Sequence, residues 1–177
     1  PASLSDEDAV FTEPLAACFE ILEQVHIRPT ERILVLGDGK LGLLAAAVLR
    51  LTHADVLLVG KHEEKLAIAR TLGINALGLD ASDRGRLWDV VIDTTGSATG
   101  FGTALSQVRP RGTIVLKTTV ADGTQLNLSP LVIDEITVVG SRCGPFGPAL
   151  EHLSQGLIDV RQLVSAVSPF TDALSAF

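Results

Sequence analysis

Residues 33–42 read Ile-Leu-Val-Leu-Gly-Asp-Gly-Lys-Leu-Gly, an apolar run followed by a glycine-rich turn. The run Arg32–Leu36 predicts a short buried strand, and the apolar positions between Lys40 and Leu51 predict a helix. A GxGxxG pattern on its own often arises by chance. Placed between a strand and a helix, it is typical of the turn that binds the pyrophosphate of a dinucleotide.

The three glycines of this turn have different roles in that interpretation. Gly37 permits the tight turn, Gly39 lets the backbone approach a pyrophosphate, and Gly42 lets the helix pack closely against the strand. The first N–H groups of the helix, near Lys40 and Leu41, are then expected to bind the anionic bridge. The alternative is a glycine-rich turn without a ligand.

Strands and helices alternate along the rest of the chain. Further strands are predicted at Asp55–Val59, Asn75–Leu79, Val90–Asp93, Thr113–Leu116 and Ile136–Gly140. Further helices are predicted at Glu63–Leu72, Ala98–Val108 and Pro148–Leu157, after two that begin near Ser5 and Glu13. This order predicts right-handed βαβ units, and therefore an α/β fold with a doubly wound parallel sheet (a Rossmann fold) flanked by helices.

Composition limits the classes of protein that remain. The chain has 177 residues, enough for one dinucleotide-binding domain over 1–177 and too few for two ordinary ones. Its net charge of −7 is spread along the chain, which weighs against nucleic acid as a partner. The longest apolar stretches, such as Leu41–Leu49, are too short to span a membrane. Cys18 and Cys143 are far apart, which favours free thiols in a reducing compartment, with the cytoplasm as the expected location.

The end of the second predicted strand bears on which dinucleotide is bound. NAD sites usually have a carboxylate there, which binds the adenosine ribose, whereas this chain has Gly60, Lys61 and His62. A glycine leaves room for a 2′-phosphate, and the next two residues offer donors, so the sequence favours NADP(H) over NAD(H). In the alternative, Lys61 and His62 are solvated, and Glu63 or Glu64 reaches back to the ribose.

Hydroxyl-bearing and small residues follow the later strands as well. They lie at Asp93–Gly96, Lys117–Thr119 and Gly140–Arg142. In an open α/β sheet, ligands bind outside the carboxyl ends of the strands, so these residues, including Arg142, are candidate contacts. Ordinary turn chemistry is the alternative for each of them.

Three ordered segments together resemble a known family. They are Glu13-Pro-Leu-Ala, the turn Val35–Gly42, and Val91-Ile-Asp-Thr-Thr-Gly. The set is similar to the coenzyme-binding domain of zinc-dependent medium-chain dehydrogenases/reductases, closest to the sorbitol, threonine and glucose dehydrogenase branch. The resemblance implies an oxidoreductase that transfers hydride between a nicotinamide coenzyme and an alcohol, polyol or carbonyl substrate.

The same resemblance implies roles for individual residues. Glu13 would lie beside the catalytic zinc and serve as one of its ligands, although its place at the start of a helix explains it equally well. Lys65 would reach the adenosine ribose, Thr94 and Thr95 would border the adenosine, and the backbone of Lys117, Thr118 and Thr119 would bind the nicotinamide carboxamide.

Full-length relatives also carry a barrel that supplies a zinc-binding Cys and a His-Glu pair, and nothing similar occurs here. The resemblance therefore implies a fragment, which would bind coenzyme but be inactive alone. Residues 1–28 would lead in from the missing domain, 29–142 would form the core, and 143–177 would return toward that domain. Val164–Phe170 would be a strand that has lost some of its partners. Thr171 would N-cap a last helix with Leu174 and Phe177 on its apolar face. Leu131–Val139 would be the interface of a homodimer or tetramer.

Two other functions remain open at this point. One is a zinc-independent enzyme of the quinone reductase type, against which Glu13 argues. The other is a nucleotide-sensing domain without catalysis. A methyltransferase that uses the same turn is disfavoured, because such folds usually have an acidic residue where Gly60 stands.

Overall fold

A computed structural model describes residues 4–79, 87–120 and 126–176. Its centre is a six-stranded sheet in the order β3-β2-β1-β4-β5-β6, with every neighbouring pair parallel. The strands are β1 (Arg32–Leu36), β2 (Asp55–Gly60), β3 (Asn75–Gly78), β4 (Trp88–Asp93), β5 (Val108–Leu116) and β6 (Thr137–Gly140). The predicted doubly wound α/β fold is confirmed, and all six predicted strands of the sheet are present.

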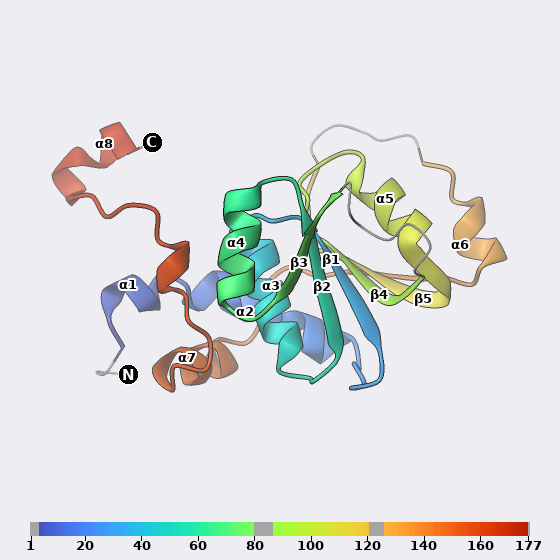
Figure 1. Cartoon of the computed structure of the whole chain (residues 1–177), viewed down its shortest axis with the longest axis horizontal. Coiled ribbons are helices and arrows are strands. Elements are labelled where there is room, and N and C mark those ends of the chain that lie inside the picture. Colours follow the sequence, from blue (N-terminus) through green and yellow to red (C-terminus); the bar gives the residue numbers. More distant parts are fainter. Residues whose placement is uncertain (1–3, 80–86, 121–125, 177) are drawn as a thin grey trace.

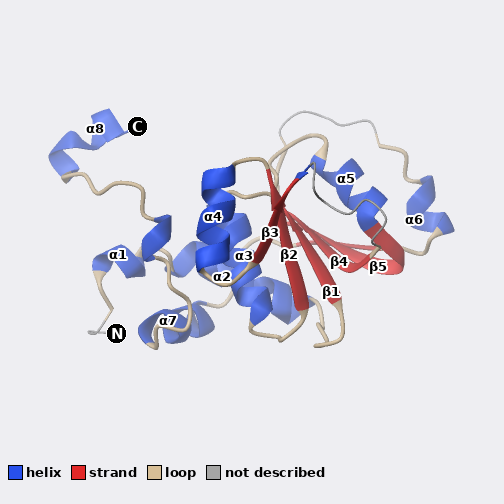
Figure 2. Cartoon of the chain, in the orientation of Figure 1, coloured by secondary structure: helices blue, strands red, loops and turns tan. Residues whose placement is uncertain are grey.

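Helices cover both faces of this sheet (Figures 1 and 2). On one side lie α2 (Thr12–Gln24), α3 (Lys40–Arg50), α4 (Glu63–Thr71) and α7 (Phe146–Ser154), and on the other α5 (Gly100–Gln107). The shorter helices are α1 (Asp6–Ala9), α6 (Ser129–Ile133) and α8 (Ala173–Ala176), with 3-10 turns η2 (Arg161–Leu163) and η3 (Phe170–Asp172). As expected, Ser5 caps α1 by accepting a hydrogen bond from the backbone N–H of Asp8.

The alternation of side chains along β1 explains why its whole sequence is apolar. Ile33 and Val35 are buried among α2, α3, α4 and α7, whereas Leu34 and Leu36 are buried with α5 on the opposite face. Because both faces are covered, a strand of this sheet needs no polar positions. The core therefore lies in two layers that hold β1 and β4 at the centre.

The strand order reverses between β1 and β4. The helix after β1 packs on one face and the helix after β4 packs on the other, so the loops at the carboxyl ends of these two strands separate. Such a reversal leaves a crevice at the edge of the sheet, which is where open α/β sheets bind their ligands.

Two expectations about the end of the chain are wrong. Val164–Phe170 is no strand. The segment runs away from the sheet toward α8 (Figure 1), and Val167 is 74% exposed. A strand needs a partner with free backbone groups, and this segment meets none in the described part of the chain. Thr171 lies inside η3 instead of capping a helix, and α8 begins two residues later with Leu174 fully in solvent. Phe177 lies outside the described residues.

Two features differ from the predicted elements. The helix α6 was not predicted. The strand β5 begins at Val108, before the predicted start at Thr113, and its pairing with β4 shifts register along the way. Arg111 has a positive φ of 60° at this irregularity. Among the described helices, none is long and apolar enough to cross a membrane.

Candidate dinucleotide-binding site

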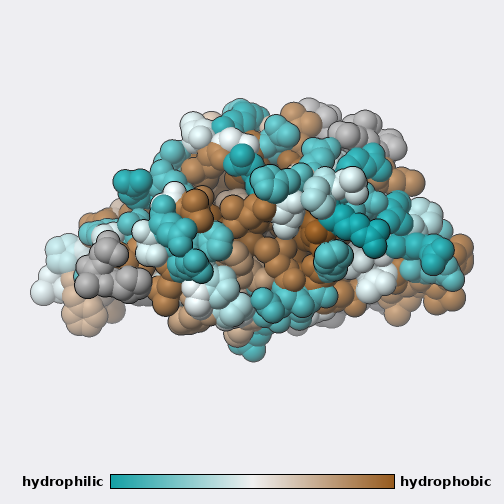
Figure 3. Space-filling model, turned by 90° about the horizontal axis from the view of Figure 1, so that it is seen from below, coloured by the Kyte–Doolittle hydropathy of each residue, from teal (hydrophilic) through white to brown (hydrophobic). Residues whose placement is uncertain are grey.

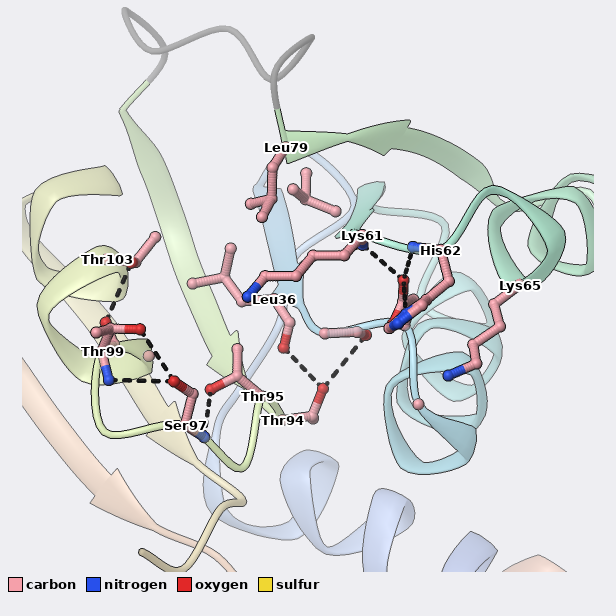
Figure 4. Close-up of a pocket in the computed structure, with 16 residues that line it drawn as sticks. Leu36, Lys61, His62, Lys65, Leu79, Thr94, Thr95, Ser97, Thr99 and Thr103 are labelled. Carbon is pink, nitrogen blue, oxygen red and sulfur yellow. Dashed lines mark hydrogen bonds and ion pairs between the residues drawn. The ribbon is translucent and has the colours of Figure 1, made fainter.

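A cavity of about 420 Å³ opens at the carboxyl ends of β1, β2 and β4 (Figure 4). It occupies the crevice at the strand-order reversal, beside the glycine turn. Eight of the predicted site residues line it: Gly37, Gly39, Gly60, Lys61, His62, Lys65, Thr94 and Thr95. The fold thus brings together residues that are up to 58 positions apart in sequence.

The first part of the turn is fixed by the neighbouring strands. Gly37 has a φ of +114°, and its backbone N–H donates to the carbonyl of Val59 at 2.9 Å. The Thr94 hydroxyl donates to the Leu36 carbonyl at 2.8 Å, and a Cβ at position 37 would lie only 2.7 Å from that hydroxyl. Thr94 therefore holds the turn, and its predicted position beside the adenosine stays a prediction.

The second part of the turn is open. Gly39 is the N-cap of α3, and a Cβ placed on it would meet no atom within 4 Å. Since glycine has no side chain to cap the helix, the N–H groups at Lys40 and Leu41 remain available at its start. Gly42 lies one turn further, where a Cβ would be 2.0 Å from the Gly37 carbonyl oxygen. An exposed helix N-terminus beside a cavity is the arrangement that binds phosphate.

A carboxylate that the sequence did not predict lies inside this site. Asp38 extends from the turn toward the end of β2, where its Oδ2 accepts hydrogen bonds from the backbone N–H groups of Lys61 and His62, both at 2.6 Å. Its Oδ1 lies 3.0 Å from Nδ1 of His62 (Figure 4). Burial raises the pKa of Asp38, but the hydrogen bonds from His62 and Lys61 outweigh burial, so the pKa is below its usual value.

Asp38 fills the space that Gly60 was expected to leave. A Cβ at position 60 would stand 2.4 Å from both the Cβ and Oδ2 of Asp38. The premise that the glycine leaves room for a 2′-phosphate is therefore wrong for this chain, because a buried carboxylate occupies that room. The choice between NAD(H) and NADP(H) itself stays a prediction.

The lysines near the end of β2 are more exposed than the carboxylate of Asp38. Lys61 extends across the cavity toward Leu36, and Lys65 projects from α4 (Figure 4). Glu63, one of the alternative ribose contacts, forms an ion pair with Arg70 on the surface of α4. That pairing directs Glu63 along its own helix and away from the predicted role.

The loop after β4 is organised around a buried carboxylate. Asp93 is fully buried, and its Oδ1 accepts from the backbone N–H of Thr95 at 2.9 Å and from the Thr95 hydroxyl at 2.8 Å. A Cβ at Gly100 would stand 2.6 Å from either carboxylate oxygen. Asp93 therefore packs against the start of α5, where the helix dipole favours a negative charge.

The predicted contacts beyond β5 do not line the main cavity. Lys117 points the other way, and its Nζ donates to the carbonyl of Ala17 at 2.6 Å, to Ser141 Oγ at 3.0 Å and to the carbonyl of Arg142 at 3.2 Å. Burial lowers the pKa of Lys117. Thr118 lines a second cavity of about 300 Å³, which Asp93 also borders. A role for the backbone of Lys117, Thr118 and Thr119 stays a prediction.

Several residues that line the main cavity were not predicted from the sequence. They are Leu36, Asp38, Val59, Leu79, Ser97, Thr99, Gly100 and Thr103. The hydroxyls of Ser97 and Thr99 lie 3.0 Å apart at the start of α5. Their position a few residues after the fourth strand was the available signal, since loops at the carboxyl ends of strands bear ligand contacts.

Comparison with known proteins agrees with this geometry. The sequence matches the family described as zinc-binding dehydrogenase over residues 41–157, well over half of the chain. The chain belongs to the zinc-binding dehydrogenase family.

A curated relative shows how much of the length of a family member this chain covers. The probable D-xylulose reductase A of Arthroderma otae is 29% identical over 195 residues, covering 100% of this chain and 55% of that protein. The chain thus spans about half the length of the curated relatives that it matches.

Two solved structures show the same fold. A putative zinc-binding dehydrogenase from Sinorhizobium meliloti 1021, bound to NADP, superposes with a TM-score of 0.85 at 24% identity, covering 93% of this chain and 53% of that one. An alcohol dehydrogenase from Escherichia coli CFT073, complexed with NADH, superposes with a TM-score of 0.89 at 21% identity, covering 99% and 56%. At these identities the likeness establishes the fold alone.

A zinc-binding dehydrogenase would need zinc ligands, and the described part of this chain does not assemble them. Zinc sites use three or four Cys, His or carboxylate ligands. Within the described residues, no three side chains of these kinds gather into a possible metal site. Glu13 is exposed in the first turn of α2. The residues present therefore do not fit a zinc site by themselves, and the ligand role of Glu13 stays a prediction.

Proposed function

We propose that this chain binds a nicotinamide dinucleotide and is the coenzyme-binding part of an alcohol or polyol dehydrogenase. The observation that carries the proposal is the open start of α3 at Gly39, facing a cavity of about 420 Å³ at the strand-order reversal. Backbone N–H groups there suit the pyrophosphate, and the walls supplied by β2 and α5 suit the groups on either side of it.

The chemistry of the reaction divides between this chain and the rest of the enzyme. When bound, the coenzyme accepts or donates the hydride, while the chain's residues bind and orient it. Zinc, and the residues that polarise the substrate oxygen, would come from outside the 177 residues. Family membership and a D-xylulose reductase relative favour this function over a quinone-reductase-type enzyme or a nucleotide sensor.

A second copy of the chain is the proposed protein partner. β6 is the last strand of the sheet, so one of its edges lacks a strand partner within the described chain. The neighbouring helix α6 exposes Val132 and Ile133 by 79% and 75%, at the end of the molecule where Figure 3 shows apolar surface. An exposed apolar edge favours pairing between copies, in agreement with the predicted interface Leu131–Val139.

The proposal is tested by titrating the chain with NADH and with NADPH in a calorimeter, followed by hydrogen exchange on the saturated complex. We expect saturable binding of at least one coenzyme, with amide exchange slowed at Gly39–Leu41 and unchanged at β6. Protection confined to another region would show that the site is misplaced. Failure of both coenzymes to bind at millimolar concentration would contradict the proposed function.

A further inference from the structure

Asp38 occupies the position at the end of β2 where coenzyme preference is decided. We propose that this carboxylate, supplied from the glycine turn, replaces the strand-end carboxylate of NAD sites and makes the chain select NAD(H) against NADP(H). The inference rests on the proposed coenzyme function and reverses the preference predicted from Gly60, Lys61 and His62 alone.

The position of the carboxylate is fixed by the backbone around it. The register of the parallel strands pairs Leu36 with Val59, so the residues that follow each strand also lie side by side. The Lys61 and His62 N–H groups both donate to Oδ2 of Asp38. The Asp38 side chain is only 8% exposed, whereas that of His62 is 52% exposed. The carboxylate is therefore held in one place at the wall of the cavity.

Gly60 and Asp38 form a complementary pair. Any side chain at position 60 would collide with Asp38, since a Cβ there would approach its Oδ2 to 2.4 Å. The usual arrangement has an acidic residue at the strand end. Here the acidic residue comes from the turn and the strand end is a glycine, so the same charge reaches the same region from a different chain position.

This arrangement suits a ribose with two hydroxyls. Oδ1 of Asp38 has one hydrogen-bond partner in the described part of the chain, His62 Nδ1, and a carboxylate oxygen accepts more than one hydrogen bond. A ribose hydroxyl can donate to Oδ1, whereas a 2′-phosphate cannot. The backbone donors of Lys61 and His62 that would bind a phosphate already donate to Asp38.

The neighbouring cations do not remove the effect of Asp38. Lys61 is exposed and Lys65 is partly exposed, so water and salt screen their charges. Asp38 is buried beside the space in question and is screened less. At about 5 Å, a carboxylate and a phosphate that carries nearly two charges repel enough to weaken binding about tenfold, even in a water-like dielectric.

The test compares ADP-ribose with 2′-phospho-ADP-ribose, because these ligands need only the part of the site that this chain provides. Calorimetry at low salt gives both dissociation constants for the wild-type chain. We expect ADP-ribose to bind at least ten times more tightly. If the 2′-phosphorylated ligand binds more tightly, the inference is overturned while the coenzyme function stands. If neither binds, the proposed function itself fails.

Variants assign the preference to Asp38. Asp38→Asn should reduce the ratio of the two dissociation constants about tenfold, and Asp55→Asn, which removes the same charge at the opposite end of β2, should leave the ratio unchanged. The double substitution Asp38→Gly with Gly60→Asp restores the usual arrangement and should keep the preference for ADP-ribose within about threefold of wild type.

Thermal melts accompany each titration, so that loss of folding is separated from loss of binding. If Asp38→Asn folds and leaves the ratio unchanged, Asp38 does not discriminate and the inference is wrong. If Asp38→Asn does not fold, the wild-type ratio and the double substitution still decide. A double variant that prefers the 2′-phosphorylated ligand would also overturn the inference.

Discussion

Replacing Gly42 by alanine should destabilise the fold, while the same replacement at Gly39 should weaken coenzyme binding and leave the fold intact. Both glycines belong to one turn, but their surroundings differ. A Cβ at Gly42 would lie 2.0 Å from the Gly37 carbonyl oxygen and 2.8 Å from the Thr94 hydroxyl, whereas a Cβ at Gly39 would meet nothing within 4 Å.

The cost at Gly42 follows from that distance. An ordinary carbon–oxygen contact needs about 3.3 Å, so α3 and the turn must separate by about 1.3 Å. Overpacking of this kind costs up to about 3 kcal/mol, and the opposing atom is backbone that cannot rotate away. Alanine recovers at most about 1 kcal/mol through its higher helix propensity. The net loss is about 2 kcal/mol, or about 4–8 °C in melting temperature for a domain of this size.

The expected result at Gly39 is the opposite. Its φ of −68° suits alanine, so the free energy of unfolding should change by less than about 0.5 kcal/mol. The added methyl group would project into the space through which a pyrophosphate approaches the helix N-terminus. We expect NADH or NADPH to bind about tenfold more weakly or worse.

The assay combines urea unfolding with coenzyme titration for each variant. Gly147→Ala is the matched control, because its Cβ also meets nothing within 4 Å and it lies on α7, away from the cavity. It should leave coenzyme binding unchanged, and it should raise the free energy of unfolding by at most about 1 kcal/mol through the higher helix propensity of alanine. The reasoning is refuted if Gly42→Ala is as stable as wild type, or if Gly39→Ala unfolds more easily and still binds coenzyme normally.

Three further measurements test other parts of the structure. The pKa of Asp38 lies below its usual value of 3.8, so the stability that it contributes is complete near neutral pH and is lost as the pH falls through the folded-state pKa. In urea titrations, Asp38→Asn should therefore lose less stability than wild type between about pH 5 and about pH 2. Burial raises the pKa of Cys18 to about 12, although Lys117 opposes this, so a thiol reagent should modify the exposed Cys143 in the native chain and Cys18 only after unfolding. Lys117→Met should lower the free energy of unfolding by about 1–3 kcal/mol in urea titrations, because it leaves three acceptors between α2 and the end of β6 without their donor.

The sheet was predictable because its signal is local. β1 was predicted with its observed bounds, since a short apolar run between a polar segment and a glycine turn is typical of a buried strand. The five-residue helix α6 carries too few apolar positions to show a period. Val164–Phe170 was expected to be a strand because relatives return toward their other domain at this point, and without strand partners from that domain the segment forms none here.

The candidate site was predictable only in part, because only some of its features can be read from consecutive residues. The glycine turn and the strand ends are read from consecutive residues, and eight of the predicted residues do line the cavity. Lys117 was predicted by its position after β5, but the direction of its side chain depends on α2, which is 100 residues earlier in the chain. Position along the chain therefore predicts which loops meet, and packing decides which side chains face the ligand.

Asp38 shows how position along the chain and packing together place a side chain in the site. Its contact with Lys61 and His62 spans 23 and 24 positions, so no local window contains it. Yet the register of β1 and β2 follows once both strands are placed, and it brings the glycine turn beside the end of β2, where the Asp38 side chain meets Gly60. A strand-end glycine therefore predicts room for a 2′-phosphate only when the facing residue of the turn is small. Here the facing residue is acidic, and the same glycine favours the opposite coenzyme.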